Sequence, residues 1–481
     1  MLLHGLIPTL LAVADKGATE PLADPHTVSG SIILFTLLLT LAVCVGVVSK
    51  KLKMPYTVAL VVAGLVVAFF KAAPEGAALG PHLVFYIVLP PILFHAGLRI
   101  NLKSLGRNWL SVVIVTALGT LVTTVIVGVV IRYFLTTDMI SENFLWVAAF
   151  MFGAMLSPTD PVSVIAAIKS IGIPVRVRTV IEGESLFNDG IAVTLFFLLS
   201  GAIFTGMNYM HEKTDVPPPQ QHESPVEVVE DAVDSIFTTE VVNDTEGLMD
   251  AVWNGALTFV TYSSVGLLIG GLLGWAAVML MRWSRDPVLE NAITVVLAYG
   301  SFIIASAESV SGVAAVIIAG IIVGATRWHD DNADDSIQTI STFWESIDYI
   351  INSLIFLLVG IELQFIGIEK LVDGNVMMAI GFVYLAMLLA RAIVVYPAGI
   401  SYGKAWPRGA SHVVFWSGLR GCVTLALVLT LPASYTGVSP ELKNFMLPTI
   451  FGVVLITLLL QGTTMRTVIR LSGCVDSKAH A

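Results

Sequence analysis

Thirteen long apolar runs divide this chain, and they constrain its fold more than any other feature of the sequence. The hydrocarbon core of a bilayer requires about 20 apolar residues per helix, within a range of roughly 17–25. The candidate membrane helices are residues 29–48, 54–70, 82–98, 109–135, 144–170, 182–206, 251–281, 287–305, 309–326, 342–363, 374–401, 409–431 and 443–469. Only 12% of the residues are charged, too few to cover the surface of a soluble protein of this size. We therefore predict an all-α polytopic membrane protein with about 13 transmembrane helices.

Basic residues predict the orientation of the chain in the membrane. They gather in every second loop, namely 49–53, 99–107, 169–180, 282–286 and 402–408. One loop on the same side, 327–336, departs because four aspartates accompany Arg327. Acids count little in the positive-inside rule. The rule then places the N-terminus outside and the C-terminus in the cytoplasm of a multi-pass protein of the cell (plasma or inner) membrane.

A long acidic stretch suggests how the helices are grouped. The predicted parts are an N-terminal signal-like or external segment (1–28), a first six-helix repeat (29–206), an external acidic loop (207–250), a connecting helix (251–281), a second six-helix repeat (287–469) and a short cytoplasmic tail (470–481). Residues 12–14, Ala-Val-Ala, resemble a signal-peptide cleavage site, so both cleavage and retention of this segment stay open. The acidic loop is interpreted as a solvated linker, with cation gathering as the alternative.

This sequence lacks the motifs that are typical of several other classes of protein. The three cysteines, Cys44, Cys422 and Cys474, form neither a disulfide framework nor a metal-binding pattern. The chain has no GxxxxGKS phosphate loop, no HExxH and no GxSxG. ATP-driven pumping and hydrolase chemistry therefore have no support, and we predict no enzyme activity and no cofactor.

Five of the charged residues that fall inside the apolar runs stand out, because translocon scales put the cost of a charge at bilayer depth at about 2.5–3.5 kcal/mol. These five are the candidates for a function at bilayer depth: Asp160, Glu184, Asp189, Arg391 and Arg420. Carboxylate, hydroxyl and main-chain carbonyl oxygens are the ligands that hard monovalent cations prefer. A carboxylate in a partly dry site can hold a proton or a metal cation, but not both well, and that competition is sufficient for exchange.

Two helix-breaking motifs occupy matching places in the two halves. SPTDP (157–161) interrupts the fifth helix of the first half, and SGLRG (417–421) interrupts the fifth helix of the second. Short or broken helices at matching positions point to a transporter built from inverted repeats. Asp160 can offset the positive end of a half-helix, and Arg420 can offset exposed carbonyl groups.

These motifs, in this order, resemble the monovalent cation:proton antiporter-1 family, the NhaP and sodium/hydrogen exchanger group. The similar segments are LPPILFHAGL (89–98), SPTDPVSV (157–164), EGESLFNDG (182–190), DPVLENAITVVLAYGSFIIA (286–305), SGVAAVIIAGIIVG (311–324), FWESIDYIINSLIFLLVG (343–360), LLARAIVVY (388–396) and WSGLRGCVTLAL (416–427). The resemblance covers most of the chain outside the first 28 residues, the acidic loop and the tail.

The resemblance implies two inverted six-helix repeats with unwound crossing helices, arranged as a core domain and a dimer domain. It makes Asp189 the main site for sodium and protons. Asp160, the Thr159 carbonyl and Ser185 would supply further oxygens, and Asn188 would orient the site. It also pairs Glu184 with Arg391 as a structural bridge and gives Arg420 a supporting role at the helix break.

One position departs from the family pattern. Bacterial relatives often carry an acid after the phenylalanine of LPPILF, where this chain has His95. A packed, hydrogen-bonded histidine and a pH-sensitive neighbour of the site are both possible, since histidine titrates near pH 6.5.

The implied function is antiport of sodium, or lithium, for protons, and it would serve pH homeostasis. Because Asn188 precedes Asp189, the family's Asn-Asp pattern implies electroneutral exchange. Potassium/proton exchange by the same fold stays open, and a passive cation channel is a weaker alternative because no filter-like TVGYG run is present. The predicted partners are sodium ions, protons, a second copy of the chain and the bilayer, with no nucleic acid.

Overall fold

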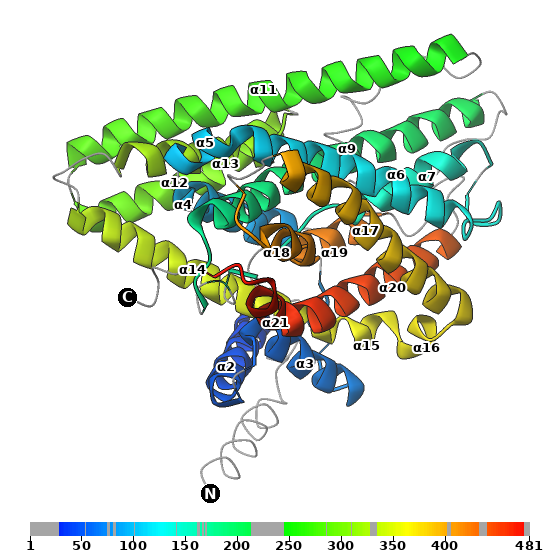
Figure 1. Cartoon of the computed structure of the whole chain (residues 1–481), viewed down its shortest axis with the longest axis horizontal. Coiled ribbons are helices and arrows are strands. Elements are labelled where there is room, and N and C mark those ends of the chain that lie inside the picture. The colour runs from blue at the N-terminus through cyan, green and yellow to red at the C-terminus, as the bar shows by residue number, and fades with distance from the viewer. Residues whose placement is uncertain are drawn as a thin grey trace, which may run out of the picture. The chain divides into compact units, whose positions relative to one another are not determined.

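The computed structural model of the chain is helical, and its elements follow one another as the apolar runs predict (Figure 1). It describes residues 28–52, 54–74, 77–79, 83–100, 102–140, 142–160, 164–165, 168, 171–212, 245–284, 286–308, 310–327, 334–401, 406–431 and 440–475. The first 27 residues, most of the acidic loop and the end of the tail lie outside this range. The predictions for signal cleavage and for the loop therefore concern residues that are not described.

The described chain forms two compact units. Unit 1 comprises residues up to Leu79 together with Ile350–Ile368, and unit 2 comprises Gly80–Tyr349 and Glu369–Ala481. Among the described residues, seven helices are long and apolar enough to cross a membrane, and several shorter apolar helices accompany them. This agrees with a polytopic helical membrane protein.

Unit 1 consists of α2 (Val28–Leu52), α3 (Tyr56–Phe69), the last part of α14 (Asp334–Ile361) and α15 (Leu363–Ile366). Helices α3 and α14 approach closely because glycines face each other: a Cβ added to Gly64 would lie 2.8 Å from the Cα of Gly360. Side chains at the start of α15 hold the segment after α3. The Gln364 amide bonds both the N–H and the C=O of Ala73, at 3.1 and 2.8 Å, and Glu362 accepts from the Leu79 N–H at 2.9 Å.

Unit 2 contains the remaining helices. They are the π-helical turn η2 (Leu83–Val88), α4 (Leu89–Arg99), α5 (Leu102–Val113), the π-helical turn η3 (Ile114–Leu118), α6 (Gly119–Arg132), α7 (Leu145–Met155), α9 (Val175–Glu212), α11 (Thr245–Ser284), α12 (Pro287–Ala307), α13 (Gly312–Arg327), the first part of α14, α17 (Gly374–Ser401), α18 (Ala410–Trp416), α19 (Cys422–Leu429), α20 (Pro440–Ile456), the π-helical turn η6 (Thr457–Gln461) and α21 (Gly462–Ser472). Short turns at Glu142–Phe144 and α16 (Ile368–Leu371) complete the described elements. The 40-residue α11 packs along α13, and α6 packs between α7 and α17.

Two helices extend beyond their apolar runs. Helix α9 continues to Glu212 and α11 begins at Thr245, so both ends of the segment predicted as a loop, 207–250, are helical. Hydropathy detects only the part of a helix that suits the bilayer, and polar turns outside it give no such signal.

Candidate ion-binding site

Two interrupted helices in unit 2 meet at their breaks. Helix α7 ends at Met155, and residues 157–160 continue without helical structure because Pro158 and the residue before it do not favour a helix. Helix α18 ends at Trp416, and α19 begins at Cys422 with Gly421 as its N-cap. The Asp160 N–H donates to the Leu419 carbonyl at 2.8 Å, which joins the two unwound segments directly.

Gly421 permits this close approach. A Cβ at this position would lie 2.7 Å from the Asp160 Cβ, nearer than side-chain atoms pack. Position 421 in the second break therefore requires glycine, because the Asp160 side chain of the first break lies against it.

Arg420 places its positive charge against the carbonyl groups that follow the end of α7. Its side chain is 2% exposed, and its Nη1 donates to the Pro158 carbonyl at 2.9 Å and to the Ser157 carbonyl. Carbonyls at the C-terminal end of a helix carry partial negative charge and attract cationic groups. The Arg420 main-chain N–H also donates to the Thr457 hydroxyl at 3.2 Å, so η6 contributes to holding this segment in place.

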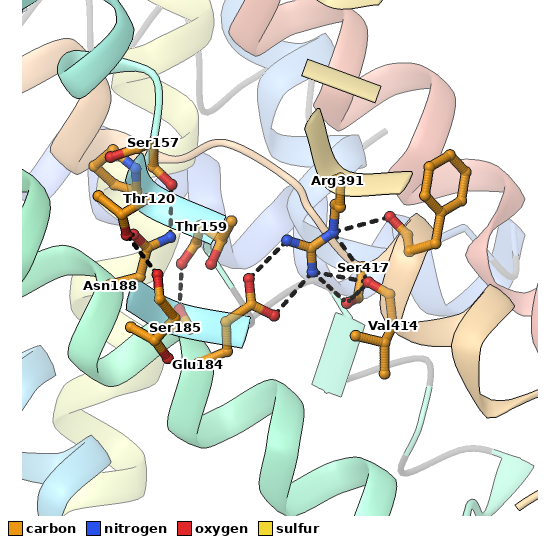
Figure 2. A network of polar contacts seen from close by, with 12 residues as sticks. Thr120, Ser157, Thr159, Glu184, Ser185, Asn188, Arg391, Val414 and Ser417 are labelled. Carbon is orange, nitrogen blue, oxygen red and sulfur yellow. Dashed lines mark hydrogen bonds and ion pairs between the residues drawn. The ribbon is translucent and has the colours of Figure 1, made fainter. Parts of the chain in front are cut away.

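Helix α9 presents its polar residues to the first break (Figure 2). The Ser185 hydroxyl donates to the Thr159 carbonyl, and the Asn188 Nδ2 donates to the Ser157 carbonyl at 2.6 Å. From α6, the Thr120 hydroxyl donates to the Asn188 Oδ1. These contacts bring Thr159, Ser185 and Asn188 together, as the resemblance implies, and add two residues that the sequence reasoning did not single out, Thr120 and Ser157.

The two aspartates lie at this network. Asp189 directly follows Asn188 and is close enough to Asp160 and Arg420 to interact with both electrostatically. Its Oδ1 is buried and has no hydrogen-bond partner among the described residues. A buried carboxylate oxygen without a donor is stabilised by a proton or a cation, and the neighbouring oxygens of Asp160, Thr159 and Ser185 are of the kind that a small cation prefers.

Glu184 and Arg391 form a two-pronged ion pair beside this network (Figure 2). Arg391 Nη1 lies 2.6 Å from Glu184 Oε1, and Nη2 lies 2.9 Å from Oε2. The same guanidinium donates to the carbonyls of Val414 and Phe415 and to the Ser417 hydroxyl at 2.8–3.2 Å. Arg391 therefore links α9 and α17 to the end of α18.

His95 has its nearest charged partner on another helix. It is 2% exposed on α4, and its Nδ1 lies 3.6 Å from Asp348 Oδ1 on α14. Its Nε2 is buried without a hydrogen-bond partner among the described residues. The sequence reasoning missed Asp348, although it stands one helical turn after Trp344 in the FWESID run, a spacing that places both residues on one face of α14.

Known proteins are similar to this chain in sequence and in fold. The family model for "Sodium/hydrogen exchanger, transmembrane" matches residues 37–471. The Na(+)/H(+) antiporter ApNhaP of Aphanothece halophytica is 32% identical over 432 residues, covering 89% of this chain and 71% of that protein. The Na(+)/H(+) antiporter NhaH of Halobacillus dabanensis is 30% identical over 455 residues, covering 92% and 98%.

A solved structure has the same arrangement of helices. The sodium proton antiporter MjNhaP1 from Methanocaldococcus jannaschii, solved at pH 8, superposes with a TM-score of 0.63 over 91% of this chain and 97% of that one, at 19% sequence identity. The family match over most of the chain and the two sequence relatives confirm what the motifs suggest: the chain belongs to the sodium/hydrogen exchanger family of transmembrane proteins.

Proposed function

We propose that this protein is a secondary active antiporter that exchanges sodium, or lithium, for protons across the cell membrane. The observation that carries the proposal is the buried Asp189 Oδ1, which has no hydrogen-bond partner in the described part of the chain and lies close to Asp160 and Arg420 of the two breaks. The names of its relatives, which are called Na(+)/H(+) antiporters, support the choice of ions.

Cation and proton compete for Asp189 in this proposal. Sodium binds to the carboxylates of Asp189 and Asp160, with the Thr159 carbonyl and the Ser185 hydroxyl as neutral ligands. The Ser185 proton is directed to the Thr159 carbonyl, which leaves the lone pairs of the Ser185 oxygen available for a cation. Since one oxygen cannot hold a proton and a sodium ion together, binding of one releases the other.

The rest of the cycle follows the family's pattern. The two breaks lie in the fifth apolar runs of the two predicted repeats, which supports inverted repeats with crossing unwound helices. We propose that the protein is a homodimer held together by its dimer domains. A core domain carrying Asp160 and Asp189 moves against the dimer domain, so that the site faces each side of the membrane in turn. The N-terminus lies outside and the C-terminus in the cytoplasm.

The charges near the site favour one-for-one exchange. Glu184 and Arg391 neutralise each other, and Arg420 adds a positive charge near the two aspartates. A site with one net negative charge is neutral with either one proton or one sodium ion. The exchange is therefore electroneutral.

Transport by purified protein tests this function. Proteoliposomes containing a pH dye are pulsed with external sodium, lithium or potassium. With wild-type protein, external sodium is expected to make the interior alkaline as protons leave. Asp189→Asn should abolish this response, because a neutral amide neither releases a proton nor carries the negative charge that binds a cation.

A matched variant separates the role of this carboxylate from general effects of the substitution. Asp373→Asn removes an exposed carboxylate at the start of α17, where asparagine can still accept from the N–H groups of Asn375 and Val376. It should transport like wild type. Near-normal exchange by Asp189→Asn would refute the proposed site. A response to potassium alone would identify a potassium/proton antiporter, and sodium entry without proton movement would identify a channel.

A further inference from the structure

The amide of Asn188 has a single chemically allowed orientation. The Ser157 main-chain oxygen can only accept a hydrogen bond, so the amide group 2.6 Å away must be the NH₂ donor. The Asn188 Oδ1 then points to the Thr120 hydroxyl on α6. Asn188 is 3% exposed and Thr120 is fully buried, so water does not readily replace either contact.

The single proton of the Thr120 hydroxyl has two acceptors within reach. One is the Thr116 carbonyl, one turn earlier at 2.9 Å, and the other is Asn188 Oδ1. The Thr116 carbonyl lies in the π-helical turn η3 and already accepts from the Gly119 N–H. Donation to Asn188 therefore satisfies both carbonyl oxygens, whereas donation to Thr116 would leave the Asn188 oxygen facing another oxygen.

Thr120 stands at one end of a continuous chain of hydrogen bonds. Thr120 donates to Asn188, Asn188 donates to Ser157, and Arg420 donates to the same Ser157 carbonyl. These two donors use both lone pairs of the Ser157 oxygen. The chain links α6 and α9 to both unwound segments, and it passes through the residue directly before Asp189.

We propose that Thr120 is a positioning residue for the ion site. Its hydroxyl fixes the Asn188 amide so that Nδ2 holds the first unwound segment and Oδ1 is turned away from the cation. This inference rests on the proposed function and assigns a role to a helix, α6, that supplies no ligand to the ion.

Thr120→Val tests the role because valine keeps the shape of threonine and replaces its hydroxyl with a methyl group. The Asn188 oxygen then loses its donor, the amide is free to turn, and the Ser157 carbonyl loses a fixed partner. We expect the sodium concentration for half-maximal exchange to rise about tenfold, with the maximal rate within about threefold of wild type. Thr120→Ser restores the hydroxyl and should recover most of the affinity.

Thr124→Val is the matched control. Thr124 lies one turn further along α6, is 5% exposed, and its hydroxyl has no hydrogen-bond partner among the described residues. The same change of residue there should leave the sodium affinity within about twofold of wild type, because the hydroxyl that is removed holds no partner. If Thr120→Val does not fold, Thr120→Ala compared with Thr120→Ser makes the same test.

Coupling to Asn188 distinguishes positioning from packing. In an Asn188→Ala background, Thr120→Val should cause no further loss of sodium affinity, measured by exchange or by the sodium-induced rise in melting temperature of the detergent-solubilised protein. A Thr120→Val protein that matches Thr124→Val, a Thr120→Ser protein as weak as Thr120→Val, or an equal further loss in the Asn188→Ala background would overturn the proposal. Absence of exchange by wild-type protein with sodium, lithium and potassium would instead refute the proposed function.

Discussion

Arg391 engages all three nitrogens of its guanidinium group within the protein, in contacts with Glu184 and with groups at the end of α18. The side chains of Arg391 and Glu184 are 10% and 3% exposed, so both charges have little access to water. Removing one partner of such a pair leaves a buried charge uncompensated, which costs about 3–5 kcal/mol. We therefore expect the pair to support the proposed ion site through stability rather than through contact with the ion.

Double substitution tests this pair. Glu184→Gln and Arg391→Gln should each lower the melting temperature of the detergent-solubilised protein. The double variant should recover part of the summed loss, because no charge is left unpaired. Losses that simply add would show that the two side chains are not coupled.

His95 and Asp348 define a second test at this scale. A protonated imidazole 3.6 Å from a carboxylate forms an ion pair, and a neutral one does not. We expect His95→Gln and Asp348→Asn each to shift the curve of exchange activity against pH, because each removes one partner of this contact. A curve that neither substitution moves would assign His95 to packing alone.

Most of the site residues that could not be predicted from the sequence are uncharged. Asp160, Asp189 and Arg420 stand out because charges are rare in apolar runs. Thr120 does not, since threonine is common in membrane helices and its value depends on a contact 68 positions away in the chain. The spacing of Thr116, Thr120 and Thr124 at every fourth residue was the available signal, because it places three hydroxyls on one face of a helix.

At the scale of helices, hydropathy predicted where the helices lie but not where they begin and end. The run predicted at 182–206 belongs to α9, which begins at Val175. Arg178, in the added first turns, pairs at 2.9 Å with Glu182 one turn later. The interruption of the fifth and twelfth runs could be predicted from proline and glycine. The hydrogen bond between Asp160 and Leu419 could not, because it joins segments distant in sequence.

Helix packing in unit 1 depends on the contact between Gly64 and Gly360. Gly64→Ala would place a Cβ 2.8 Å from the Gly360 Cα and 2.9 Å from the Ile361 nitrogen, so α3 and α14 must separate. Overpacking of this kind costs about 1–3 kcal/mol, and the melting temperature should fall. Gly381→Ala on α17 is the control: its Cβ meets nothing within 4 Å, and helix propensity favours alanine by about 1 kcal/mol. Equal melting temperatures for the two variants would contradict the packing argument.

At the scale of the whole molecule, one-for-one exchange has an electrical consequence. Moving one elementary charge through 100 mV is worth about 2.3 kcal/mol, and an electroneutral cycle does not experience that energy. In vesicles with a potential imposed by potassium and valinomycin, the point at which sodium-driven proton flux reverses should depend on the sodium and proton gradients alone. A reversal point that moves with voltage would show that Asp160 also carries a proton.

Main-chain carbonyls make up much of the junction between the two breaks. The Ser157 carbonyl accepts from Arg420 and Asn188, and the Pro158 carbonyl accepts from Arg420. The Thr159 carbonyl accepts from Ser185, and the Leu419 carbonyl accepts from the Asp160 N–H. Every amino acid carries the same main-chain carbonyl. Substitutions at positions 157 and 159 should therefore be tolerated as long as the backbone keeps its conformation. Pro158 and Gly421, which set that conformation, have no such freedom. A saturation library scored for growth in sodium should therefore rank the residues that shape the backbone above several of the residues that we propose as ligands of the ion.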